Sequence, residues 1–292
     1  MFIKLRCIFV FLCLLHSNSA LAIDIIKINS GQSKSDIRSL YKMEIINQAL
    51  TLTEPDFGAF EIRRQGPPTT IDRAILEVVS GESINTFIAL TTQQWEDNTL
   101  AIRIPIRRGI LNYRLLVINK DSQSNFTNIS SVNDLKKLKA GVRIGWATTK
   151  VLAQNEFNLH ISSSYEGLFY MLQSNRIDYI PRGINEIYDE ITLHKDQLNN
   201  LDIEPNIALY IPAPTYIFVS PTEPIIAKRL TEGLELMVRN GMLKKLFNKY
   251  YKDKLKKANL SQRTIFPVKY NILPKLTPLD RKELWFEFDV NE

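Results

Sequence analysis

The chain has 292 residues, with 37 Lys and Arg against 31 Asp and Glu, a formal net charge of +6 and a hydrophobic share of 45 %. This length and apolar content are enough to bury a large core in one large or two medium domains, which excludes a disordered chain and a small disulfide-held protein. The modest charge does not indicate nucleic-acid binding, and we expect no nucleic-acid partner.

The first 22 residues have the pattern of a signal peptide. Lys4 and Arg6 precede a short apolar run over 8–15, and the segment ends in Ala20-Leu21-Ala22. The run is too short for a bilayer span of about 20 residues, so we expect cleavage after Ala22, with an uncleaved anchor as the alternative. Both cysteines, Cys7 and Cys13, lie in this segment. An exported chain without disulfides fits a bacterial periplasm.

The next part of the chain alternates predicted strands and helices. Strands are expected over 25–28, 60–62 and 85–90, and a half-buried strand over 100–107, where apolar residues recur at every second position. Helices are expected after Asp36 and after 67–70, because apolar side chains follow each start at helical spacing.

The same alternation continues to residue 251. Strands are expected over 113–118, 141–146, 160–162, 177–180 (ending at Pro181) and 216–219. Helices are expected after Ser131, Thr148 and Asn185, and over 165–172, 224–240 and 243–251. The tail after Lys257 has no clear period and should wrap the surface. Strands alternating with helices predict an α/β architecture with largely parallel sheets.

Three segments carry a family resemblance: SVNDLKKL over 131–138 with GVRIG over 141–145 and Thr148-Thr149; LQSNRIDY over 172–179; and RNGMLKKLFNKY over 239–250. In this order, behind a signal peptide, they resemble class II periplasmic solute-binding proteins of the amino-acid ABC transporter type (solute-binding family 3), in an atypical form. The resemblance covers most of residues 24–255.

The resemblance implies two lobes, each a mostly parallel sheet flanked by helices, with a ligand cleft between them that closes by hinge bending, as a Venus flytrap does. The chain would cross between lobes near 109–112 and 213–216. Lobe one would hold residues 23–108 and 217–292, including the tail, and lobe two residues 112–212.

The family's three amino-acid-binding devices are only partly present. Thr148 and Thr149 match the Thr at a helix N-terminus, where free N–H groups favour an anion, although plain capping is the alternative. The Arg that clamps a carboxylate would fall at Gln94 or Trp95. The Asp that binds an amine would fall near Gly183, beside the cation Arg182. These departures argue against an ordinary α-amino acid in the ordinary pose.

Four arginines and two tryptophans complete the candidate ligand-binding residues. Arg182, at a strand end, and the arginines near the first crossing are suited to a carboxylate or phosphate, with surface solvation or an ion pair as the alternative. The indoles could pack on the ligand or belong to the core. These residues are Arg182, Arg107, Arg108, Arg114, Trp146 and Trp95.

Catalysis has little support in the sequence. No nucleophile–base motif or phosphate loop occurs, and we expect no cofactor and no metal. His160 and His194 are expected to be structural or exposed, and Glu186, Asp189 and Glu190 to form a solvated helix face.

The sequence thus predicts a monomeric periplasmic binder of a small polar ligand, with an acidic ligand among the candidates, that serves an ABC permease. A periplasmic sensor acting through a membrane receptor is the alternative, and an exported hydrolase is a weaker one.

Overall fold

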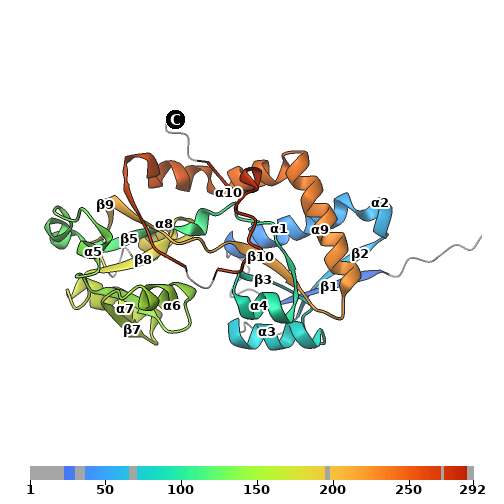
Figure 1. Cartoon of the computed structure of the whole chain (residues 1–292), viewed down its shortest axis with the longest axis horizontal. Coiled ribbons are helices and arrows are strands. Elements are labelled where there is room, and N and C mark those ends of the chain that lie inside the picture. Colours follow the sequence, from blue (N-terminus) through green and yellow to red (C-terminus); the bar gives the residue numbers. More distant parts are fainter. Residues whose placement is uncertain (1–22, 30–36, 66–70, 195–197, 271–272, 288–292) are drawn as a thin grey trace, which may run out of the picture.

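The computed structural model describes residues 23–29, 37–65, 71–194, 198–270 and 273–287, so the predicted signal peptide lies outside the described residues. Figure 1 shows two α/β halves side by side, with helix α10 (Met242–Ala258) running along both. Among the described helices, none has the length and hydropathy to cross a membrane.

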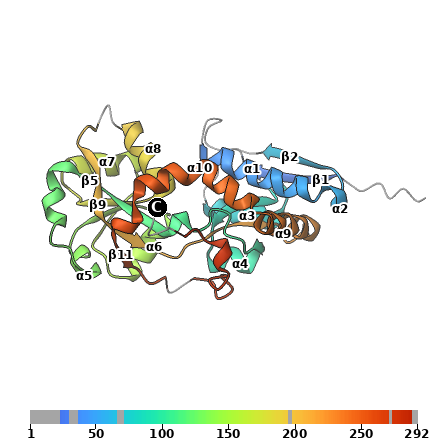
Figure 2. The ribbon, with the colours of Figure 1, turned by 90° about the horizontal axis from the view of Figure 1, so that it is seen from above.

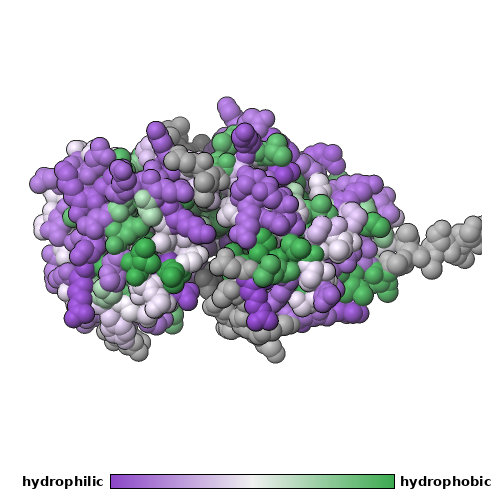
Figure 3. Space-filling model, turned by 60° about the horizontal axis from the view of Figure 1, so that its bottom comes forward, coloured by the Kyte–Doolittle hydropathy of each residue, from purple (hydrophilic) through white to green (hydrophobic). Residues whose placement is uncertain are grey.

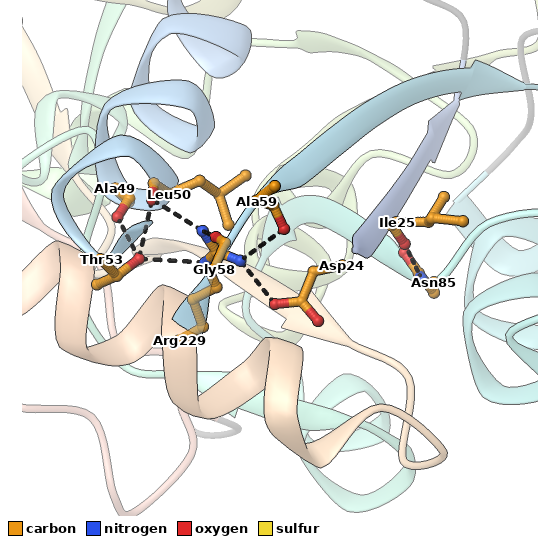
Figure 4. Close-up of polar contacts among 9 residues, drawn as sticks. All are labelled: Asp24, Ile25, Ala49, Leu50, Thr53, Gly58, Ala59, Asn85 and Arg229. Atoms are coloured by element: carbon orange, nitrogen blue, oxygen red, sulfur yellow. Dashed lines mark hydrogen bonds and ion pairs between the residues drawn. The ribbon is translucent and has the colours of Figure 1, made fainter. Parts of the chain in front are cut away.

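The half that contains the N-terminal part is built on two small sheets. Parallel strands β1 and β2 form one sheet, and β10 lies between β3 and β4 in the other, antiparallel to both. Asn85 joins the sheets, because its side chain donates to the Ile25 carbonyl at 2.8 Å, as Figure 4 shows. The same side chain accepts from the Lys27 N–H at 2.8 Å. The elements of this half are β1 (Asp24–Asn29), α1 (Ile37–Leu52), α2 (Glu54–Phe57), β2 (Phe60–Gln65), α3 (Ile71–Ser80), β3 (Thr86–Leu90), α4 (Gln93–Asn98), β4 (Leu100–Ile102), β10 (Thr215–Val219) and α9 (Pro224–Arg239).

The other half is built on one six-stranded sheet in the order β11-β9-β5-β8-β6-β7. Five of these strands share a direction and only β5 opposes them. Its elements are η1 (Ile110–Asn112), β5 (Tyr113–Asn119), η2 (Lys120–Phe126), α5 (Val132–Leu135), β6 (Ala140–Arg143), α6 (Ala147–Gln154), β7 (Leu159–Ser162), α7 (Tyr165–Gln173), β8 (Tyr179–Gly183), α8 (Ile184–His194), β9 (Leu201–Tyr210) and β11 (Thr264–Pro267). Two short turns, η3 (Leu260–Gln262) and η4 (Lys282–Leu284), lie in the tail.

The chain passes from the first half to the second between Ile102 and Tyr113 and returns between Tyr210 and Thr215. Asn112 ties the two passages together: its carbonyl accepts from the Ile211 N–H at 2.7 Å, and its side-chain oxygen accepts from the Ala213 N–H at 3.0 Å. The expected fold class, α/β with two lobes and mostly parallel sheets, is confirmed. We call the halves lobe one and lobe two.

Apolar burial follows the faces of the sheets. In lobe two, side chains such as Ile180 pack under α7 and α8, and those on the opposite face, such as Tyr179, pack toward α6 and the tail. In lobe one, α1 and α9 approach so closely that a Cβ on Gly233 would stand 2.2 Å from the Ala49 carbonyl oxygen, so this position requires glycine.

Several predicted boundaries move. The strand expected over 100–107 ends at Ile102 and the one over 141–146 ends at Arg143, while α2 and α4 are not predicted from the sequence. The strand expected to stop at Pro181 continues to Gly183. On one side of β8, Pro181 lies opposite Leu116 of β5; on the other side, β6 pairs with β8 only at Tyr179. Strand β8 therefore has a free edge beyond Tyr179, where proline, which has no N–H to donate, can be accommodated.

Strand β9 is missed by the sequence analysis because Glu204-Pro205-Asn206 has the composition of a turn. These residues instead form an irregularity where the register with β5 shifts between Leu115 and Val117. The Glu204 carboxylate stabilises it by accepting from the Asn206 N–H at 2.9 Å and the Ile207 N–H at 2.5 Å.

The expected placement of residues 217–292 in lobe one is wrong for β11, which pairs in parallel with β9 of lobe two. The tail therefore contacts both lobes.

Candidate functional site

A buried ionic cluster lies at the end of β8. Arg182 is 7 % exposed and makes a bidentate ion pair with Glu190 of α8, from Nε to Oε2 at 2.7 Å and from Nη2 to Oε1 at 2.5 Å. Its Nη2 also lies 3.0 Å from Glu186 Oε1. Burial alone would lower the pKa of Arg182, but the carboxylates of Glu186 and Glu190 outweigh it and raise that pKa above its ordinary value.

Two aromatic rings cover the same guanidinium. The Arg182 Cζ lies 4.3 Å from the centre of the Trp146 ring and 5.8 Å from that of Tyr165, distances at which a cation is attracted to a ring face. Trp146 immediately precedes α6 and Tyr165 begins α7. Arg182 is thus held by contacts from α7, from α8 and from the residue that precedes α6, and the carboxylates of α8 compensate its charge.

Arg114 enters the cluster from β5. It lies opposite Gly183 in the β5–β8 pairing, and its Nη1 is 3.9 Å from Glu186 Oε1. Arg114 is 5 % exposed and its Nε has no hydrogen-bond partner within the described structure. Burial lowers the pKa of Arg114 to about 10, against the opposing effect of Glu186. Because β5 begins directly after the first crossing, the cluster lies at the end of the lobe-two sheet nearest lobe one.

The other two arginines of the first crossing differ from each other. Arg108 Nη2 donates to the Trp285 carbonyl at 2.6 Å, and its own carbonyl accepts from the Phe286 N–H at 2.8 Å, so it holds the C-terminal tail. Arg107 is 8 % exposed and, within the described residues, no hydrogen bond or ion pair is found for its side chain; its buried Nε is unpartnered.

Thr148 and Thr149 both lie in the first turn of α6, which begins one residue earlier than predicted, at Ala147. The Thr149 hydroxyl donates to the Arg143 carbonyl at 2.7 Å and so closes the turn that precedes the helix. Within the described residues, no side-chain hydrogen bond is found for the Thr148 hydroxyl. Of the residues at this helix start, Trp146 is the one with a contact to Arg182, and the two threonines follow it in the first turn of α6.

Trp95 is not placed for ligand contact. It is 2 % exposed and stacks on Phe87 at 5.4 Å and Phe218 at 4.9 Å between ring centres, inside the core of lobe one. Its predicted role in the ligand site is wrong, because α4 turns this face of the helix toward the sheet. Thr92, which caps α4, accepts from the Trp95 N–H at 3.3 Å and fixes that orientation.

Sequence reasoning missed the acids of the cluster. Glu186 and Glu190 were expected on a solvated face, yet Glu190 is only 8 % exposed. Their signal is the spacing from Arg182, four and eight residues later, which places both on the helix side that faces the strand end. His194, on the same helix, is structural as expected: it is 5 % exposed and its ring centre lies 4.2 Å from that of Phe169.

The described residues hold no group of three or more His, Cys, Asp or Glu placed to bind a metal. Figure 3 shows the face on which α6, α7, α3 and α4 lie, and the surface there is indented between the two lobes.

No protein-family model matches the chain and no curated protein matches it. Solved structures match the chain, among them the following three. An ancestral arginine-binding protein bound to arginine is 19 % identical with a TM-score of 0.51, over 72 % of this chain and 87 % of that one. YckB of Bacillus subtilis is 19 % identical with a TM-score of 0.53, over 85 % and 97 %. An ancestral amino-acid-binding protein, a precursor of cyclohexadienyl dehydratase, is 14 % identical with a TM-score of 0.52, over 78 % and 95 %. At these identities the likeness establishes the architecture, and the chain has the two-lobed fold of the solute-binding proteins that its sequence resembles.

Proposed function

We propose that the protein is a periplasmic solute-binding protein that takes one small polar ligand between its lobes and delivers it to an ABC permease. The observation that carries this proposal is the fold itself: two lobes joined by two adjacent crossings, with a polar cluster at the end of the lobe-two sheet nearest lobe one. Two of the similar structures are named as binding proteins, one for arginine and one for amino acids. The signal-peptide pattern of residues 1–22 supports export.

An acidic group on the ligand is the finer part of the proposal. Arg182 gives it little support, because Glu186 and Glu190 already balance its charge. Arg107 supports it better. The Arg107 Nε is buried without a hydrogen-bond partner in the described residues, which is costly, and a carboxylate would satisfy it together with an Nη donor in the planar arrangement that Arg prefers. Its place in the first crossing puts it at the junction of the lobes.

A ligand screen tests the binding role. The chain from residue 23 should be melted in the presence of amino acids, dicarboxylates and short peptides. A ligand at a hundred times its dissociation constant adds about 2.7 kcal/mol, which raises the melting temperature by about 5 to 10 °C for a chain of this size. If no compound in the panel shifts the melting temperature, the binding role loses its support.

A pair of variants then tests the acidic group. Arg107→Gln should lose the ligand-induced shift for an acidic ligand, whereas Arg73→Gln, which removes an exposed arginine of α3, should keep it. Equal ligand affinity in Arg107→Gln and the unmodified chain would overturn the role of Arg107 while leaving the binding role intact.

A further inference from the structure

The tail beyond α10 connects the two lobes along one side of the molecule. We define the C-terminal strap as residues 264–270 and 273–287. In Figures 1 and 2 it is the dark red segment that leaves the lobe containing α5–α8 and continues to the lobe containing α3 and α9. Its contacts with each lobe are specific, which distinguishes it from a tail lying loosely on the surface.

The first part of the strap is bound to lobe two. β11 is the edge strand of the six-stranded sheet and pairs with β9, and the Val268 N–H donates to the Tyr210 carbonyl at 2.9 Å. Asn155, at the end of α6, donates to the Lys269 carbonyl at 2.7 Å. Val268 and Tyr270 are buried in the apolar cluster of this lobe.

The second part is bound to lobe one. Arg281 pairs with both carboxylate oxygens of Glu235 on α9, at 2.6 and 3.0 Å. Tyr270 makes the transition between lobes, because its ring is buried in lobe two while its hydroxyl lies 3.4 Å from the Thr91 carbonyl at the end of β3. The strap therefore has fixed points on either side of the junction.

The end of the strap packs on the first crossing itself. Arg108 is hydrogen-bonded to Trp285 and Phe286, as described above. The Trp285 ring lies against Gly109: a Cβ there would stand 2.8 Å from Trp285 Cε3, and the positive φ of 81° also requires glycine. The Phe286 ring lies 5.4 Å from that of Tyr113, at the start of β5.

We propose that the C-terminal strap limits how far the two lobes rotate relative to each other. Lobe movement in a two-lobed protein is absorbed by backbone rotation in the few residues of the crossings. Rotation here would have to separate contacts that the strap makes with both lobes and with 108–113. Because such conformational equilibria are set by small free-energy differences, these contacts are enough to select a narrow range of lobe angles.

The test measures the distance between lobes without any ligand, so its result does not depend on the proposed function. The chain from residue 23 has no cysteine, which allows spin labels at Ser80→Cys on lobe one and Ser174→Cys on lobe two. Pulsed electron paramagnetic resonance then gives the distance distribution. In the labelled protein with an unmodified strap, we expect a single narrow distribution of the distance between the two labels.

The strap-release variant combines Arg281→Gln with Trp285→Ala. We expect a broader distribution in this variant, while Arg73→Gln, an exposed arginine of lobe one outside the strap, keeps the narrow one. If Trp285→Ala prevents folding, Arg281→Gln combined with Tyr270→Phe removes polar contacts only and should broaden the distribution as well. An unchanged width in a folded release variant overturns the proposal, as does a broad distribution in the unmodified chain.

Discussion

Arg182 and Glu190 form a bidentate ion pair that is buried between β8 and α8, with Nε 2.7 Å from Oε2 and Nη2 2.5 Å from Oε1. In the sequence, Arg182 is a candidate to meet an acidic ligand, with an ion pair to a nearby acid as the alternative, and the structure has that ion pair. It joins the strand end to the helix and, with Arg114 and Glu186, forms a buried cluster of two cations and two anions. Its energetics can be tested directly.

Removing one member should cost more than removing both. Glu190→Gln leaves the buried Arg182 with only Glu186 close by, and we expect a loss on the order of 3 kcal/mol in the free energy of unfolding, measured by urea denaturation. The double variant Arg182→Met with Glu190→Leu should recover most of that loss, because no unpaired charge is then buried. A double variant as unstable as Glu190→Gln would contradict this account.

The sequence predicted most strands and helices in their order, because periodicity and capping residues are local signals, but it missed α2, α4, β9 and β11. The crossings at 109–112 and 213–216 were expected from the resemblance, and the structure links them through Asn112. The strap contacts could not be predicted, because β11 pairs with the free edge of β9. Strand β9 was itself not predicted, because Glu204-Pro205-Asn206 has the composition of a turn. Trp95 shows the same limit: an aromatic near a strand end fits a core and a binding site equally well, and only packing against Phe87 and Phe218 decides.

Arg229 on α9 joins four segments of lobe one (Figure 4). It is 0 % exposed, its Nη1 lies 2.8 Å from Asp24 Oδ2, and its other donors reach Thr53 and the carbonyls of Leu50 and Gly58 at 2.7 to 3.2 Å. Arg229→Met should lower the free energy of unfolding by about 3 to 5 kcal/mol, because it removes the cation paired with the Asp24 carboxylate and the donor to the Gly58 carbonyl.

Two controls accompany the Arg229 variant. Arg239→Met, at the exposed end of the same helix, should change stability by less than about 0.5 kcal/mol. Arg229→Lys should be nearly as unstable as Arg229→Met, because an ammonium cannot reach all four of the acceptor residues that the guanidinium contacts. If Arg229→Lys is as stable as the unmodified chain, the positive charge at this position stabilises lobe one without the planar donor arrangement of a guanidinium.

Glu44 on α1 gives the stability of lobe one a pH dependence. Partial burial alone would raise the pKa of Glu44, but hydrogen bonds from Lys249 at 2.7 Å and Tyr250 at 2.6 Å outweigh it and lower that pKa below its ordinary value. An acid whose pKa is lower in the folded state contributes stability above its unfolded pKa, and loses that contribution as the pH falls through the folded value.

The comparison of Glu44→Gln with the unmodified chain isolates this contribution. At pH 7 the variant should be less stable, and the difference should shrink as the pH falls from about 5 to below 4, where the carboxyl becomes protonated. Urea denaturation at a series of pH values measures it. A difference that stays constant over this range would mean that the substitution acts through lost packing and not through lost charge.

Thr148 and Thr149 are adjacent in α6 but should respond differently to the same substitution. The Thr149 hydroxyl is already used, donating to the Arg143 carbonyl at 2.7 Å, so Thr149→Val should cost about 1 kcal/mol of stability and leave the affinity of the folded protein for its ligand nearly unchanged. For the Thr148 hydroxyl, no side-chain partner is found within the described residues, so Thr148→Val should leave stability nearly unchanged. A helix N-terminus can hold an anion. If the start of α6 holds part of the ligand, Thr148→Val should lower the ligand affinity, which calorimetry measures. Affinity that falls in Thr149→Val but not in Thr148→Val would reverse this assignment and move the ligand contact to the turn at Arg143.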